Sequence, residues 1–177
     1  MGAAAVVLLA GCGGRGGGEK VVFPTPSGAL LSGASPTGQI INMGLHPLHN
    51  SSKGSVRIQS VRLVGMPGSA RLVGVTAYLE DQVGLGAIVG FIGDLAKTCP
   101  SKFTPHPVTA AVTPARSDSR WEIVVAVRFT RPGHYDFTHV KITYVTGGRE
   151  GWQYAYMGIN VTAVKPSGKV RPTSCPI

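Results

Sequence analysis

Hydrophobic and polar residues alternate most regularly between positions 120 and 130. Large apolar side chains occupy every second position there: Trp121, Ile123, Val125, Val127 and Phe129. Because successive side chains of a strand point to opposite faces, this period of two predicts a strand with one face in a core.

The same period predicts other strands, over Gln39–Met43, Ser55–Val64, Ala70–Glu80 and His134–Val145 and in a return strand that contains Trp152, Tyr154 and Tyr156. The apolar parity changes near Gln59 and again after Phe137, and each change predicts a β-bulge. The Gly147–Gly148 pair predicts a hairpin between the last two strands.

The inward face of the strand predicted over Ala70–Glu80 is expected to carry Val73, Val75, Ala77 and Leu79. The Gly-rich segment 83–95 fits a buried strand, a broken helix or a covering loop, and residues 94–97 are expected to close a short helical turn. Residues 98–119 contain four prolines and predict a long loop. Six or seven short antiparallel strands with turn signals between them predict an all-β fold, an immunoglobulin-like β-sandwich of about seven strands.

Composition agrees with this class. The chain has 25 Gly and 13 Pro in 177 residues, and both residue types disfavour the long helices of a bundle. Hydrophobic residues make up 43% and charged residues 14%, which excludes disorder of the bulk of the chain.

The first ten residues, MGAAAVVLLA, form an apolar run that is too short to span a membrane as a helix. They are followed by Gly11 and Cys12, so that Leu9 to Cys12 resembles the lipobox of bacterial lipoproteins. The resemblance implies that residues 1–11 are a signal peptide and that Cys12 receives a lipid. Residues 12–38, rich in Gly and Pro, are expected to be a flexible linker, and residues 39–177 the folded domain. The alternative is an apolar N-terminus that is not processed.

Residues 131–164 contain a Pro-Gly turn, aromatic residues, Thr143–Tyr144 and a Gly-Gly turn, a succession that resembles the closing strands of immunoglobulin-like envelope domains. The whole chain resembles the small, uncharacterised immunoglobulin-like lipoproteins of actinobacterial-type bacteria. That resemblance implies a protein held by its lipid at the extracytoplasmic face of the cell membrane, and it carries over no catalytic residues.

Three cysteines are present. If Cys12 carries a lipid, Cys99 and Cys175 form an even pair in an oxidising compartment, which predicts a disulfide between them. The alternative, a catalytic thiol, lacks a Cys-x-x-Cys motif.

The net charge is +9, and the basic residues stand singly on separate segments. Nucleic-acid binding is not expected, because it usually clusters basic and aromatic residues. The expected partners are the membrane, through the lipid anchor, and anionic envelope polymers or another envelope protein.

Few residues point to chemistry. Met43, His46 and His49 have the soft and imidazole ligand types that suit copper, although we expect them to be ordinary loop and strand residues. Common nucleophile, phosphate-binding and zinc-protease motifs are absent from the sequence, so neither an enzyme nor a cofactor is expected.

The aromatic row formed by Trp152, Tyr154 and Tyr156 has two interpretations. With few aromatic residues available for a core, we expect the row to face inward; an outward row would be a ligand-binding platform. Three hypotheses follow. The first is a lipid-anchored, non-catalytic binding or scaffolding domain, the second a copper-binding lipoprotein, and the third a weak binder of wall polymers or glycans.

Overall fold

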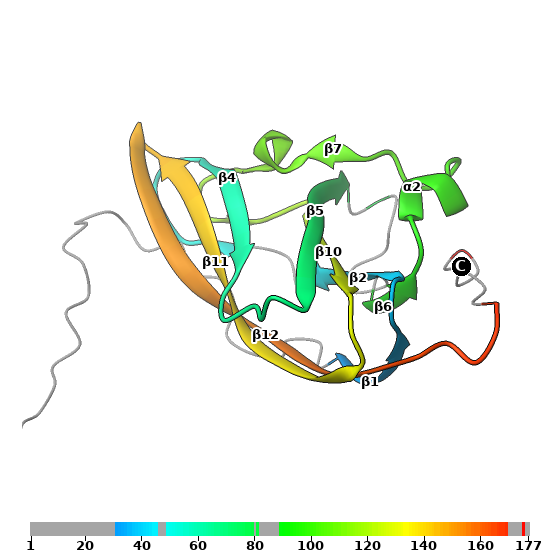
Figure 1. The fold of residues 1–177 in the computed structure, drawn as a ribbon. Coiled ribbons are helices and arrows are strands. Elements are labelled where there is room, and N and C mark those ends of the chain that lie inside the picture. The colour runs from blue at the N-terminus through cyan, green and yellow to red at the C-terminus, as the bar shows by residue number, and fades with distance from the viewer. Residues whose placement is uncertain (1–30, 46–48, 80, 82–88, 170–174, 176–177) are drawn as a thin grey trace, which may run out of the picture.

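A computed structural model describes residues 31–45, 49–79, 81, 89–169 and 175, and most of them lie in β-strands. The first of two five-stranded sheets has the order β1–β12–β11–β4–β8 (Figure 1). It consists of β1 (Leu31–Pro36), β12 (Arg149–Val164), β11 (Gly133–Thr146), β4 (Val56–Leu63) and β8 (Val112–Thr113).

The second sheet has the order β6–β2–β10–β5–β7. It consists of β6 (Val89–Ile92), β2 (Ile40–Leu45), β10 (Trp121–Phe129), β5 (Ala70–Leu79) and β7 (His106–Pro107). A small separate pair is formed by β3 (His49–Asn50) and β9 (Ser117–Asp118), and the remaining elements are the short helix α2 (Leu95–Thr98) and the 3-10 turn η1 (Val108–Ala110). All strand pairs are antiparallel except β1 with β12.

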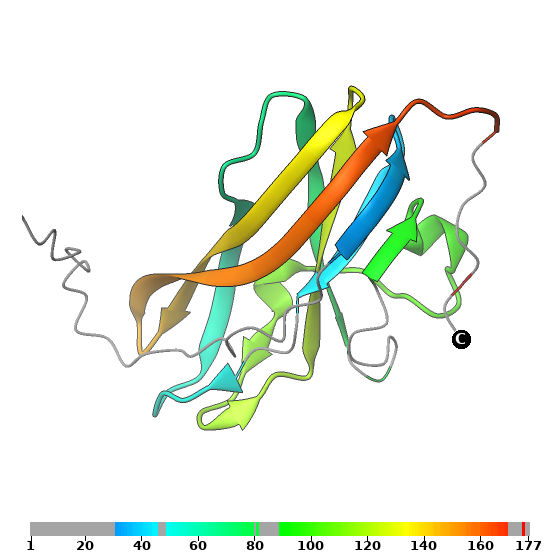
Figure 2. The same cartoon turned by 90° about the horizontal axis from the view of Figure 1, so that it is seen from below.

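The two sheets lie against one another as two layers (Figures 1 and 2). They share one hydrophobic core, to which each contributes its inward side chains. The second sheet supplies Ile41 and Met43 from β2 together with the predicted apolar row of β10; the first supplies Ile58 from β4 and Ile142 from β11. The mostly-β class predicted from the alternation is confirmed.

Both predicted bulges are confirmed by the strand registers. In the pairing of β4 with β11, Thr143 is opposite Ser60 and Tyr144 opposite Ile58, so Gln59 is the extra residue. In the pairing of β11 with β12, the register shifts between Phe137 and His139. The predicted hairpin is also confirmed, because Gly147 and Gly148 both have positive φ, as its two central residues require.

Two expectations about individual segments are wrong. Residues 31–36, assigned from the sequence to the linker, form β1, which pairs with β12 through its backbone and so needs no apolar side chains. Val73 was expected to face inward, yet its side chain is 45% exposed. On β10, Ala126 pairs with Gly74 and Val127 pairs with Leu72, so Val73 has no partner and is the extra residue of a β-bulge. The regular alternation of apolar residues gave no sign of this bulge.

Part of the outer face of the second sheet is covered, around Tyr78 and Val124, whereas Val73 on β5 is exposed. Tyr78 and Val124 on that face form a second buried cluster with Leu95, Cys99 and Phe103 from the α2 region. Asn42 Nδ2 donates a hydrogen bond to the carbonyl oxygen of Gly93 at 2.7 Å, which ties β2 to the segment that leads into α2. The Pro-rich segment predicted as a long loop contains only η1 and the two-residue strands β7, β8 and β9.

Candidate binding face

The outer face of β12, β11 and β4 carries a group of aromatic and basic side chains. Cross-strand register places Tyr154 opposite Lys141, and Lys141 opposite Arg62, in one row across the three strands. The neighbouring row is Trp152, Thr143 and Ser60, and Arg57 lies opposite Val145 beyond it. We call Trp152, Tyr154, Lys141, Arg62 and Arg57 the aromatic–basic face.

The two aromatic rings of this face are exposed and in contact. Trp152 is 52% exposed and Tyr154 is 50% exposed. Their ring centroids are 5.2 Å apart with planes at 66°, an edge-to-face arrangement of the kind that aromatic pairs favour. The His139 ring lies against Tyr154 with a centroid distance of 6.4 Å. The rings therefore form a stepped surface that neighbouring side chains support.

Lys141 joins the aromatic and basic parts of the face. Its Nζ lies 4.7 Å from the centroid of the Trp152 ring, within the range of a cation–π interaction. Lys141, Arg62 and Arg57 form no ion pair with a carboxylate among the described residues. Glu150 is exposed in the same row as Arg57, on the other side of Val145, so the outer face of these strands carries three cations and one carboxylate that forms no ion pair with them.

The inward interpretation of the aromatic row is therefore wrong for Trp152 and Tyr154. The aromatic residues do alternate along β12. However, the residues between them, such as Gly151 and Ala155, are the ones that face the core, and their side chains are small. A Cβ at Gly151 would meet the Tyr144 ring at 2.9 Å, so the core is filled from β11 at this point. The side chain of Tyr156 lies outside the described residues.

Sequence reasoning did not identify Lys141, Arg62 and Arg57 as one group. These residues stand far apart in the sequence and looked dispersed, and only the pairing of β4 with β11 brings them together. The parity change at Gln59 was an available signal, because it sets which residues of β4 face outward on either side of the bulge.

The three residues considered for copper do not form a group in the described part of the chain. Met43 is buried in the core between the sheets, and His46 lies outside the described residues. His49 Nδ1 lies 2.7 Å from Asp118 Oδ1, which joins β3 to β9. Among the described residues, no three His, Cys, Asp or Glu side chains lie close enough together to hold a metal ion. This arrangement gives the copper hypothesis no support.

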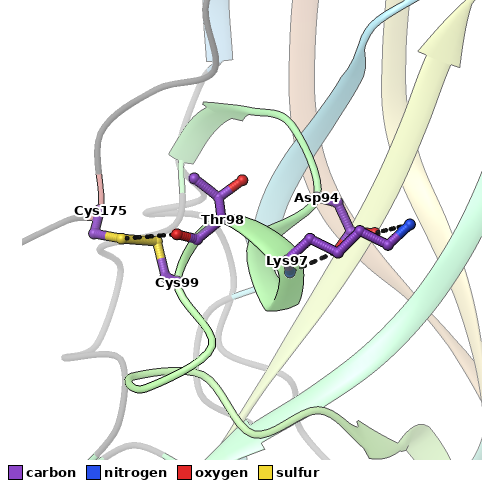
Figure 3. Close-up of a disulfide and its surroundings, with 5 residues drawn as sticks. All are labelled: Asp94, Lys97, Thr98, Cys99 and Cys175. Carbon is purple, nitrogen blue, oxygen red and sulfur yellow. Dashed lines mark hydrogen bonds and ion pairs between the residues drawn. A yellow bond between two sulfur atoms is a disulfide. The ribbon is translucent and has the colours of Figure 1, made fainter.

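Cys99 and Cys175 form a disulfide, with Cα atoms 5.8 Å apart, in agreement with the predicted pairing (Figure 3). Cys99 follows α2 directly and lies in the cluster that covers the second sheet, and Cys175 Sγ lies 3.5 Å from the carbonyl oxygen of Thr98. At the other end of α2, Asp94 Oδ1 accepts a hydrogen bond from the backbone N–H of Lys97. The disulfide thus holds the C-terminal segment to the covering layer.

The titration of Tyr78 is shifted. Burial raises the pKa of its hydroxyl above the ordinary value of 10.0, and the negative charge of Asp94 raises this pKa further. The Tyr78 ring packs edge-to-face on Phe103, with centroids 5.8 Å apart. These contacts suit a side chain of the second sheet that the α2 region buries.

Cys12 and the other residues of the predicted signal lie outside the described residues. Of the two adjacent acidic residues at the end of β5, Glu80 also lies outside them and Asp81 is exposed. No helix among the described residues has the length and apolar character that a membrane span requires.

No protein-family model matches this chain, and no curated protein matches its sequence. Among solved structures, that of the Vibrio cholerae VesB protease is similar over 76% of this chain and 31% of that chain, with 10% sequence identity and a TM-score of 0.37. The chain therefore spans about a third of the length of that protein. A likeness this distant carries no argument about fold or catalysis here.

Proposed function

We propose that this chain is a lipid-anchored protein of the bacterial cell envelope whose immunoglobulin-like domain binds a partner without catalysis. The observation that carries the proposal is the aromatic–basic face, where Trp152 and Tyr154 are exposed beside three cations that no described carboxylate pairs with. Exposed aromatic side chains grouped on one face are typical of binding sites, because their burial by a partner is favourable.

Strand order supports the immunoglobulin-like assignment. In that fold, strands B, E and D are neighbours in one sheet and strands C, F and G in the other. Here β2, β10 and β5 are neighbours in one sheet and β4, β11 and β12 in the other. The correspondence also follows the order of the chain. Strands B to G of the immunoglobulin-like fold match, in sequence, β2, β4, β5, β10, β11 and β12.

A tyrosine at the start of β11 adds to this support. The Tyr135 hydroxyl donates a hydrogen bond to the carbonyl oxygen of Arg131 at 2.8 Å. Immunoglobulin-like domains have a tyrosine in this place, near the start of strand F, whose hydroxyl bonds back to the preceding corner. The disulfide differs from that of antibody domains, because it joins the end of α2 to the C-terminal segment instead of one sheet to the other.

The distribution of titratable groups supports a binding role. In the part of the chain that the structure describes, His, Cys, Asp and Glu side chains do not gather in threes. The aromatic–basic face itself offers rings and cations, which suit the binding of a ligand.

The anchor is the part of the proposal that depends on the lipobox. Replacing the thiol that receives the lipid, in Cys12→Ala, is expected to move the full-length protein from the membrane fraction to the soluble fraction. The double variant Cys99→Ala/Cys175→Ala is the control, because it removes the two disulfide cysteines together, leaves no unpaired thiol in the folded domain and keeps Cys12. Retention of Cys12→Ala in the membrane fraction would refute the anchor.

Binding is tested separately, with purified full-length protein and lipid-extracted envelopes of the producing bacterium. We expect wild-type protein to sediment with the envelopes and Trp152→Ala to sediment about tenfold less. Val73→Ala is the control, since Val73 is a similarly exposed apolar residue on the other sheet. Equal sedimentation of the wild type and Trp152→Ala would show that this face does not bind.

A further inference from the structure

We infer that the aromatic–basic face binds a linear acidic polysaccharide, an inference that rests on the proposed binding role of this face. The first reason is how the side chains are divided across the strands. Both described aromatic rings are on β12, both arginines are on β4, and Lys141 lies between them on β11. A ligand laid along these strands meets the two rings on the β12 flank and the cations on the other flank, and Glu150 marks the end of the β12 flank beyond Trp152.

An acidic sugar chain has the same division. The ring C–H groups of a sugar form an apolar surface that packs against an aromatic ring, whereas its carboxylate projects from the rim of the ring. Lys141 links the two flanks, because its Nζ lies 4.7 Å from the Trp152 centroid. A sugar carboxylate near Trp152 therefore meets an ammonium group that is already in place, which lowers the cost of ordering the site.

Charge supports the acidic character of the ligand. Arg57, Arg62 and Lys141 have no carboxylate partner among the described residues, and a polyanion supplies several such partners at once. Cations of this kind attract a polyanion at long range and add salt-sensitive affinity.

The ring geometry disfavours a single-stranded nucleic acid. Successive bases stack on aromatic rings that present open, roughly parallel faces. The planes of Trp152 and Tyr154 are inclined at 66° with centroids 5.2 Å apart, so no base fits between them. An anionic lipid surface also binds aromatic rings together with cations, so vesicles are included as a competing ligand in the test.

The test measures binding of the full-length protein to polygalacturonate and to the same polymer with its carboxylates methyl-esterified. Esterification keeps the sugar faces and removes the charge, so we expect binding to weaken about tenfold or more. Oligothymidylate and phosphatidylglycerol vesicles are the competing ligands, and both are expected to bind more weakly than polygalacturonate.

Variants separate the two flanks. The double variant Trp152→Ala/Tyr154→Ala is expected to bind polygalacturonate about tenfold more weakly, with an unchanged dependence on salt. Arg62→Gln/Lys141→Gln is expected to weaken binding and also to flatten its salt dependence, because it removes the charges that salt screens. Arg71→Gln and Val73→Ala, at exposed positions of the other sheet, are the controls and should bind like the wild type.

Equal binding to the ester, or tighter binding to oligothymidylate or vesicles, would overturn the inference. Absence of polygalacturonate binding while envelope sedimentation still depends on Trp152 would overturn the ligand class and leave the proposed function intact. If sedimentation itself is insensitive to Trp152→Ala, the proposed function fails as well.

Discussion

The two sheets of this protein differ in how their outer faces are used. On the β2–β10–β5 side, Leu95 of α2 and the following residues Cys99 and Phe103 cover Tyr78 and Val124. Together they form a second buried cluster. On the β12–β11–β4 side, Trp152 and Tyr154 remain half exposed in the described structure. The difference indicates that the covered part of the β2–β10–β5 face stabilises the domain, whereas the β12–β11–β4 face is open to a partner.

Truncation of Phe103, the largest side chain that the α2 region contributes to the second buried cluster, is expected to have the largest effect. Phe103 is 2% exposed, so Phe103→Ala should lower the free energy of unfolding by about 3–5 kcal/mol through lost burial and a cavity. Trp152→Ala should lower it by about 1 kcal/mol or less, because it removes only a surface cross-strand pair. Urea unfolding of both variants tests the comparison, and similar losses would contradict it.

Removal of the disulfide is expected to have the second-largest effect on stability. It joins residues 76 positions apart, and its removal in Cys99→Ala/Cys175→Ala should cost about 2–4 kcal/mol, because the unfolded chain gains freedom. Unfolding curves with and without reductant provide the measurement, and reductant should change the wild type only. Binding to envelopes should survive at temperatures where the variant stays folded; loss of binding there would link the two faces.

A pair of glycines on the second sheet distinguishes covered from open positions. A Cβ at Gly44 would overlap Oε1 of Glu122, whose side chain is 1% exposed, so Gly44→Ala should cost about 1–3 kcal/mol. A Cβ at Gly74 meets nothing within 4 Å, so Gly74→Ala should be neutral or slightly stabilising. Thermal unfolding of the two variants is the check, and an equal cost at both positions would show that Glu122 does not occupy the space beside Gly44.

The smallest expected effect is a dependence of folding stability on pH, which arises from Tyr78 on the covered face. Because the folded pKa of Tyr78 is raised above 10.0, the folded state keeps a proton that the unfolded state releases. Stability should therefore fall as the pH rises above about 10, and Tyr78→Phe should lose less over the same range. Urea unfolding at neutral and alkaline pH measures both losses. An identical loss in the variant would show that Tyr78 is not buried as described.

Local patterns predicted much of the fold. The alternation in β10, the two parity changes and the Gly147–Gly148 pair each indicate a feature that depends on neighbouring residues alone, and each is present. The segment of β1 could not be recognised, because its Gly, Ser and Pro residues become a strand only by pairing with the distant β12.

The candidate site was harder to predict for a related reason. Periodicity showed that Trp152 and Tyr154 share a face, but it did not show which face was buried. That choice depends on whether a covering layer exists, and the sequence gives no local sign that α2 covers the second sheet and not the first. The grouping of Arg62 with Lys141 likewise depends on register between strands that are far apart in the chain.

The most direct test of the open face is the acrylamide quenching of Trp152 in full-length Trp121→Phe protein, which contains no other tryptophan. Quenching should be efficient in the free protein and should decrease when solubilised envelope polymers are added to saturation, because the partner covers the ring. Unchanged quenching while the polymers are bound would contradict the account, since the partner would then contact another part of the molecule.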